Sequence, residues 1–218
     1  MVVPVPVKGY FEENTYFWID EETGRGFMID PGWEGDKLLR MIRYNGWIIE
    51  KILLTHGHFD HMGAADQVRE ALGIPVLAHE NCAAYLENPK WNLSVFCGTP
   101  ILVQDVTTLG DGDTVAPEGV PDASFRVIHT PGHTTDSVCY YCERDGLCFT
   151  GDTIFRGAIG NDRFPGGDRT RMIRSICTRI LTLPDETVLW SGHSEATTVG
   201  EEKRFFGPWG GWLRADGD

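Results

Sequence analysis

The sequence has no excess of basic residues. It contains 19 Lys and Arg against 32 Asp and Glu, which gives a formal net charge of −13 at pH 7. Nucleic acids and anionic membrane surfaces are bound through clustered positive charge, so we expect neither of them as a partner. Solubility is a sufficient reason for the acidic balance.

Long apolar runs and a basic leader segment are also missing. No stretch reaches the roughly 18 to 20 apolar residues that a membrane-spanning helix needs. The segment from Met1 to Lys8 has no basic start and is interrupted by proline, so it is expected to form an edge strand rather than a signal peptide. Six irregularly spaced cysteines fit reduced thiols. We therefore expect a cytoplasmic location.

One cysteine pair has the spacing of a redox or zinc motif. Cys139 and Cys142 are separated by two tyrosines in a run that reads as a strand. An odd separation along a strand turns the two side chains to opposite faces. We therefore predict that both cysteines have packing roles.

The order of apolar patterns along the chain predicts an α/β fold. The 218 residues, of which 41% are hydrophobic and 23% charged, suit a single globular domain over 1–218. Strand patterns come first and then alternate with helix patterns. The segment 88–112 has only a weak pattern. The expected strands are 14–20, 26–30, 48–54, 74–78, 124–128, 137–142, 147–150 and 187–190, and the expected helices are 36–44, 64–72, 80–86 and 169–183.

The stretch directly after the apolar segment 48–54 is the most informative part of the chain. Three of the seven histidines, His56, His58 and His61, lie here beside Asp60. Imidazole and carboxylate are the mixed ligand set of catalytic metal sites. If 48–55 is a strand, His56 and His58 leave its end together and can converge on one ion.

Asp60 and His61 lie past the following turn, so they are expected to hold a second metal, about 3.5–4 Å from the first in typical two-metal sites. The alternative is a surface loop that is merely rich in histidine. A helical zinc motif of the His-Glu-x-x-His type is excluded by the spacing.

Three other polar residues follow expected strands. Asp30 either orients a ligand histidine or starts a turn before Pro31 and Gly32. His79 and His129 have no cluster of ligand-type neighbours, so we expect them to be structural.

Four motifs resemble those of the metallo-β-lactamase superfamily in sequence and in their order along the chain, and the resemblance covers about residues 10–204. The surroundings of Asp152, residues 151–157 and 164–168, most resemble the glyoxalase II branch, the hydroxyacylglutathione hydrolases. The motifs are Thr55-His56-Gly57-His58-Phe59-Asp60-His61, Thr130-Pro131-Gly132-His133-Thr134, Phe149-Thr150-Gly151-Asp152-Thr153 and Ser191-Gly192-His193.

The resemblance implies a four-layer αββα sandwich and two divalent metal ions, zinc first, with iron or manganese as alternatives. Asp152 would bridge the ions, and a hydroxide would complete the bridge. The implied ligand sets are His56, His58 and His133 for one metal, and Asp60, His61 and His193 for the other.

The implied activity is hydrolysis of hydroxyacyl-glutathione or a related small acyl thioester. Asp60 and Asp152 are the expected catalytic residues. Arg156 is a candidate to bind an anionic part of the substrate, and the alternative for it is an ordinary surface ion pair. Only 194–218 follow the last ligand, so we expect a short form without the helical C-terminal domain of the longer enzymes.

The sequence departs from the branch pattern around the expected cleft, at Thr135-Asp136, at 161–163 and at Ser194-Glu195. None of these changes removes a ligand, but all affect the pocket. The activity therefore has alternatives: a persulfide dioxygenase with one iron, a lactonase, or a non-catalytic sensor on the same scaffold.

Overall fold

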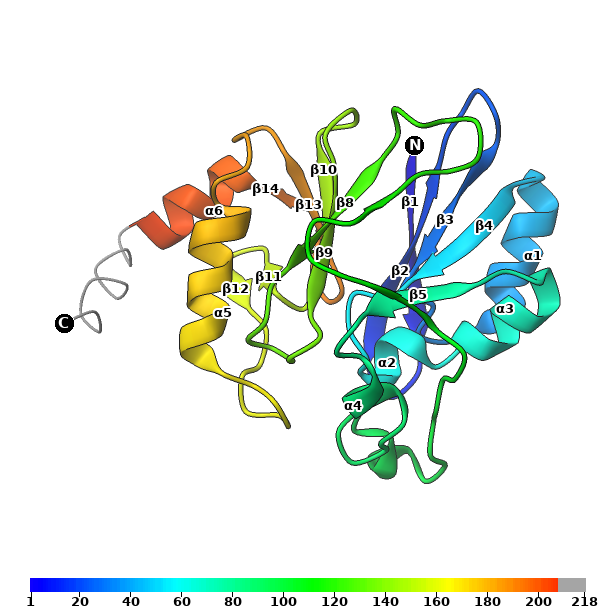
Figure 1. Ribbon diagram of the computed structural model, residues 1–218, viewed down its shortest axis with the longest axis horizontal. Coiled ribbons are helices and arrows are strands. Elements are labelled where there is room, and N and C mark those ends of the chain that lie inside the picture. Colours follow the sequence, from blue (N-terminus) through cyan, green and yellow to red (C-terminus); the bar gives the residue numbers. More distant parts are fainter. Residues whose placement is uncertain (208–218) are drawn as a thin grey trace.

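Two six-stranded sheets face each other at the centre of the molecule (Figure 1). The structure is a computed structural model that describes residues 1–207. In the first sheet the strands follow chain order, antiparallel from β1 to β3 and parallel from β3 to β6. They are β1 Val2–Lys8, β2 Glu12–Ile19, β3 Arg25–Ile29, β4 Ile48–Leu53, β5 Val76–His79 and β6 Thr107–Leu109.

The second sheet has the order β14-β13-β10-β9-β8-β7, in which only β10 and β13 are parallel. A separate hairpin pairs β11 with β12. The strands are β7 Thr114–Val115, β8 Phe125–His129, β9 Val138–Cys142, β10 Leu147–Gly151, β11 Ile154–Phe155, β12 Ala158–Ile159, β13 Val188–Ser191 and β14 Thr197–Thr198.

Helices cover the outer faces of both sheets. In Figure 1, α1 and α3 lie outside the first sheet, α5 and α6 lie outside the second, and α2 and α4 lie below the first sheet. The expected four-layer αββα sandwich is therefore confirmed. The helices are α1 Gly35–Asn45, α2 Phe59–Met62, α3 Ala65–Leu72, α4 Ala83–Leu86, α5 Arg169–Ser175 and α6 Val199–Phe206, with a 3₁₀ turn at Ser94–Cys97 and a π-helical turn at Ile176–Ile180.

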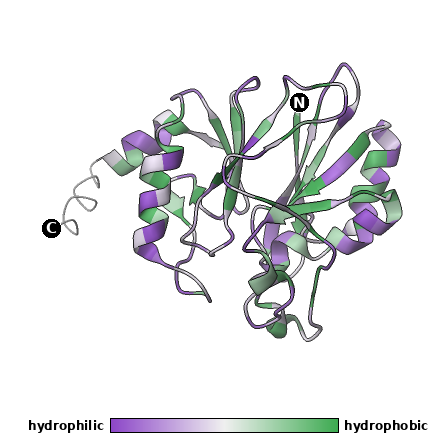
Figure 2. Cartoon of the chain, viewed as in Figure 1, coloured by the Kyte–Doolittle hydropathy of each residue, from purple (hydrophilic) through white to green (hydrophobic). Residues whose placement is uncertain are grey.

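Alternating side chains on the strands build three apolar layers. In β2, Phe17 and Ile19 face the helices α1 and α3, while Tyr16 and Trp18 face the second sheet. The third layer lies between the second sheet and α5. Each fully buried side chain of this size contributes about 1.5–3 kcal/mol. Figure 2 shows the same arrangement, with hydrophobic strands inside and helices that are hydrophilic on part of their surface.

The expectations for β1 and β9 are confirmed. β1 lies at the edge of its sheet and pairs only with β2, so the missing amide hydrogens of Pro4 and Pro6 are tolerated. Cys139 and Cys142 in β9 belong to different apolar layers on opposite faces of the sheet. No helix among the described residues is long and apolar enough to cross a membrane.

Several expectations for the elements need correction. Residues 169–183 do not form one α-helix, because the backbone changes to a π-helical turn in which Leu181 N–H donates to Ile176 O at 2.8 Å. The helix expected from residue 80 begins at Ala83. The strands β6, β7, β11, β12 and β14 were not expected, and each has only two or three residues, too few to show a period.

The weakly patterned segment 88–112 is ordered by one buried amide. Asn92 Nδ2 donates to Tyr85 O at 3.0 Å and to Ile101 O at 2.8 Å, which ties the loop to the end of α4. Of the aromatic residues near the C-terminus, Trp209 and Trp212 lie outside the described residues.

Candidate metal centre

The seven expected ligands come together at one edge of the sandwich. Most of them follow the end of a strand, where side chains leave the sheet toward a loop, and α2 supplies the others. The contributing segments are the loop after β4 with His56 and His58, α2 with Asp60 and His61, the β8–β9 loop with His133, the end of β10 with Asp152, and the end of β13 with His193.

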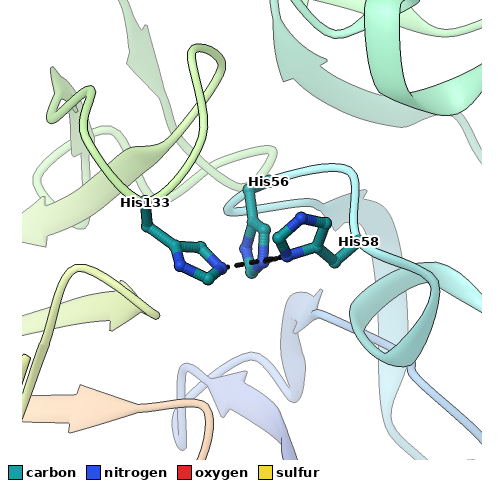
Figure 3. Close-up of side chains that lie close together, drawn as sticks. All are labelled: His56, His58 and His133. Atoms are coloured by element: carbon teal, nitrogen blue, oxygen red, sulfur yellow. Dashed lines mark hydrogen bonds between the residues drawn. The ribbon is translucent and has the colours of Figure 1, made fainter. Parts of the chain in front are cut away.

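Three imidazoles form the first cluster (Figure 3). His58 Nδ1 lies 3.1 Å from His56 Nε2 and 2.9 Å from His133 Nε2, and each side chain is only 2% exposed. Burial lowers the pKa of His58 to about 3, so this imidazole is neutral at pH 7. Three converging imidazole nitrogens are a suitable donor set for a metal ion.

A carboxylate and two imidazoles form the second cluster. His193 Nε2 lies 3.3 Å from His61 Nε2 and 3.3 Å from Asp60 Oδ2. His61 is fully buried, whereas the His193 side chain is 23% exposed. The second cluster is therefore the one that solvent reaches.

Asp152 lies between the two clusters. Its Oδ1 is 3.3 Å from His61 Nε2, and its Oδ2 is 3.5 Å from His193 Nε2 and 3.6 Å from His133 Nε2. Burial alone would raise the pKa of Asp152, but the charge of the neighbouring His61 is the largest of the causes that hold it well below its usual value. Asp152 Oδ1 is buried and has no hydrogen-bond partner, as expected of an atom that ligates a metal.

Backbone carbonyls fix the tautomers of two ligands. His133 Nδ1 donates to Asn161 O at 2.7 Å, and His193 Nδ1 donates to Glu12 O at 2.8 Å. A carbonyl oxygen only accepts, so in both rings the Nε2 lone pair is left facing the cluster.

Asp30 positions both His61 and the start of the ligand loop. Its Oδ2 accepts from His61 Nδ1 at 3.0 Å, and its two oxygens accept from the Thr55 amide at 2.7 Å and the Thr55 hydroxyl at 2.6 Å. Of the two roles considered for Asp30, the structure supports the orientation of a ligand histidine.

Two glycines are required by close approach. A methyl group on Gly57 would lie 2.6 Å from Tyr85 Cβ, and one on Gly192 would lie 2.5 Å from His61 Cε1 and 2.6 Å from Asp152 Oδ1. Distances this short exclude a side chain at both positions. The role of Gly57 is therefore to let the ligand loop pack directly on α4.

Two buried carboxyl groups near the clusters were not expected. Glu13 is 1% exposed, its Oε1 lies 3.9 Å from His61 Nδ1, and burial raises its pKa well above the usual value. Asp136 is also 1% exposed, and burial raises its pKa to about 7. Asp136 Oδ2 would lie 3.2 Å from a methyl group on Gly57, so the carboxyl group lies against the ligand loop. Both of its oxygens are buried without a hydrogen-bond partner. From the sequence, Asp136 stood out only as a departure from the branch pattern.

The remaining candidates lie outside the clusters. Arg156 Nη1 pairs with Glu195 Oε2 at 2.6 Å, and its side chain is 56% exposed. This is the surface ion pair considered as the alternative, and a role in substrate binding stays a prediction. His79 and His129 stack on each other with ring centroids 4.0 Å apart. Neither ring belongs to a metal-type cluster among the described residues.

A match to the metallo-beta-lactamase superfamily covers residues 10–193, and the chain belongs to that superfamily. The family and the buried His/Asp clusters together define a metal-dependent hydrolase. The branch within the superfamily is not decided by this match.

Relatives of similar length carry several names. The chain is 36% identical to the probable metallo-hydrolase YqgX of Bacillus subtilis, over 88% of this chain and 89% of that protein. It is 32% identical to the hydroxyacylglutathione hydrolase GloC of Haemophilus influenzae, over 92% of this chain and 93% of that protein.

Among solved structures, the BLEG-1 B3 metallo-beta-lactamase is similar with a TM-score of 0.87 and 35% identity, covering 94% of this chain and 97% of that one. TTHA1623 in a di-iron-bound form is similar with a TM-score of 0.82 and 36% identity, covering 93% of this chain and 98% of that one. ETHE1 from Myxococcus xanthus is similar with a TM-score of 0.75 and 28% identity, covering 94% of this chain and 82% of that one.

Proposed function

We propose that the chain is a binuclear metal-dependent thioesterase of the glyoxalase II-like branch. The observation that carries this proposal is the position of Asp152, whose Oδ2 lies 3.5 Å from His193 Nε2 of one cluster and 3.6 Å from His133 Nε2 of the other. A site for one metal would not need the complete second set that Asp60, His61 and His193 form.

In this proposal the first cluster would hold one ion and the second cluster the other, with Asp152 available to both. Zinc fits the nitrogen-rich donor sets, and the di-iron form of TTHA1623 supports iron as the alternative. When bound, such ions lower the pKa of a water molecule to about 7 and polarise a carbonyl group. Asp30 and the carbonyls of Asn161 and Glu12 keep the ligand rings in the orientation and tautomer that this requires.

Thioesters suit this site because their leaving group needs little help. A thiol has a pKa of about 8.5 and leaves as a thiolate without a positioned acid, whereas an amide nitrogen must be protonated. The side chains that form the two clusters are proposed metal ligands, and the buried Glu13 lies on the Nδ1 side of His61. Neither group therefore serves as a positioned acid in this proposal. Hydroxyacyl-glutathione or a related small acyl thioester is the proposed substrate, and the likeness to GloC supports it.

Hydrolysis of S-lactoylglutathione and of a simple acyl thioester by the purified, metal-loaded chain tests the proposal. We expect turnover of both, no oxygen uptake with glutathione persulfide, and about two metal ions per chain. Oxygen consumption matching persulfide loss, with one iron and no thioesterase activity, would establish the persulfide dioxygenase instead. Lactone hydrolysis is the third assay, and inactivity in all three with bound metal would favour a sensor.

A further inference from the structure

A hollow opens beside the candidate metal centre, where the two sheets meet. It has a volume of about 600 Å³ and lies between the β1–β2 edge of the first sheet and the loop after β13. This size is within the roughly 300–1,000 Å³ of ordinary small-molecule pockets. Its apolar walls are Pro4 and Pro6 from β1, Tyr16 from β2, Trp190 from β13, and Ala196.

The groove borders the candidate metal centre at His193. One edge of this ring faces the cluster, with Nε2 3.3 Å from Asp60 Oδ2, and the ring also lines the groove. Asn14 ties the two walls together, because its Nδ2 donates to Ser191 O at 3.2 Å and to Ser194 O at 3.1 Å. A molecule bound at the second cluster would therefore lie next to this groove.

The chemistry of the walls favours an uncharged apolar group. Tyr16 and Trp190 pack at 5.7 Å between ring centroids, and the Tyr16 hydroxyl is already used, donating to Ser191 O at 2.6 Å. The charged side chains that line the groove, among the described residues, are the carboxylates of Glu12 and Glu195, and no lysine or arginine lies beside them. The groove therefore disfavours an anion. The nearby Arg156 is held by Glu195 at 2.6 Å.

We propose that this groove binds a neutral apolar substituent of the substrate. This inference rests on the proposed thioesterase activity and deepens it, because it names the part of the substrate that gives specificity. Walls of two prolines and two aromatic rings stabilise a hydrocarbon chain or an aryl ring by removing apolar surface from water. A carboxylate in the same place would lose its hydration without gaining a cation. Thioesters with an apolar substituent should therefore be preferred to those that end in a charge.

The kinetic test uses thioesters of the neutral thiol N-acetylcysteamine. Acetyl, octanoyl and carboxylate-ended acyl groups are compared, and acetyl esters of an alkyl thiol vary the other side. We expect kcat/KM to rise at least tenfold from the short to the long apolar ester in one of the two series, and to fall again at least tenfold when the chain ends in a carboxylate. Equal values across both series would overturn the proposal.

Filling the groove provides the matched variants. Ala196→Trp should reduce the ratio of long-ester to short-ester kcat/KM at least tenfold, and the milder Ala196→Leu should reduce it in the same direction. Ala71→Trp makes the same kind of change at an exposed position of α3, and should leave the ratio unchanged. Folding of each variant is checked by circular dichroism. A ratio that does not change in either Ala196 variant would contradict the assignment.

A binding measurement separates this inference from the proposed activity. The probe is a non-hydrolysable octyl thioether of N-acetylcysteamine, with Kd measured by calorimetry. Binding that weakens at least tenfold in Ala196→Trp but not in Ala71→Trp would uphold the groove even if no thioester were hydrolysed. Thioester hydrolysis without chain-length preference, and without thioether binding, would uphold the activity and sink the groove.

Discussion

The two metal-type clusters differ in composition and in their surroundings. The first consists of three neutral imidazoles that are each 2% exposed, and it packs against α4 through Gly57. The second contains the carboxylate of Asp60, is supported by Asp30, and reaches solvent and the groove through His193, whose side chain is 23% exposed. In the proposed binuclear site, the first cluster would hold its ion in a buried setting, and the second would hold its ion next to an incoming molecule.

The largest expected effect comes from removing the residue that joins the clusters. Asp152→Ala should abolish turnover, with a loss well beyond the roughly 10–100-fold that follows removal of an outer partner of a metal ligand. We expect the metal content to fall while the protein stays folded, because Asp152 lies in a loop and its burial opposes its charge. Metal analysis and circular dichroism test this. Full turnover and metal content would exclude a bridging role.

The next largest effect is expected from a variant that weakens only the second cluster. Asp30→Asn leaves His61 Nδ1 without its carboxylate partner, so affinity for the second ion should fall roughly 10–100-fold while the first ion is retained. Titration of the metal-free protein with zinc should then show one tight site and one weakened site. Asp20→Asn is the control, because the carboxylate of this aspartate also follows a strand but accepts from Thr23 and Arg144, away from both clusters. Equal loss at both sites would show that Asp30 supports the whole loop.

The sequence predicted one half of this comparison better than the other. His56, His58, Asp60 and His61 fall within six positions, so their chemistry is visible in the order of residues alone. The buried residues that lie behind the ligands are not visible in the order of residues. Glu13 is 48 positions from His61 and contributes only because β2 runs beside the loop that carries it.

The same reason limited the prediction of the pocket. The strands that carry Pro4, Tyr16 and Trp190 were predicted, but the groove between them depends on how the edges of two sheets meet. Because Arg156 is four residues after Asp152 in the sequence, it was a candidate to bind substrate. Only the structure shows that it pairs with Glu195. Short strands such as β11 and β14 were missed because two residues show no periodicity.

A smaller effect is expected from the stacked histidines outside the clusters. Burial, and then the charge of His129, lowers the pKa of His79 to about 4, against about 6.5 in an unfolded chain. The unfolded chain thus takes up a proton first as pH falls, so the stability contributed by neutral His79 is complete above pH 6.5 and is lost toward pH 4. His79→Gln should reduce the loss of stability between pH 7 and pH 5, measured by urea unfolding at constant metal load. An unchanged pH dependence would mean that His79 does not contribute to it.

The smallest expected effect is at Arg156, which pairs with Glu195 of the groove lining. An exposed ion pair contributes about 0–1 kcal/mol, so Arg156→Ala should leave the free energy of unfolding nearly unchanged. Its guanidinium is engaged by Glu195, so we expect the KM for S-lactoylglutathione to rise less than about tenfold, which is 1.4 kcal/mol. Glu195→Ala is the matched variant, because it frees Arg156 and should improve binding of an anionic thioester relative to a neutral one. If Arg156→Ala raised KM a hundredfold for the anionic substrate alone, Arg156 would exchange its partner for the substrate, and the second cluster would face an anion-binding rim as well as an apolar groove.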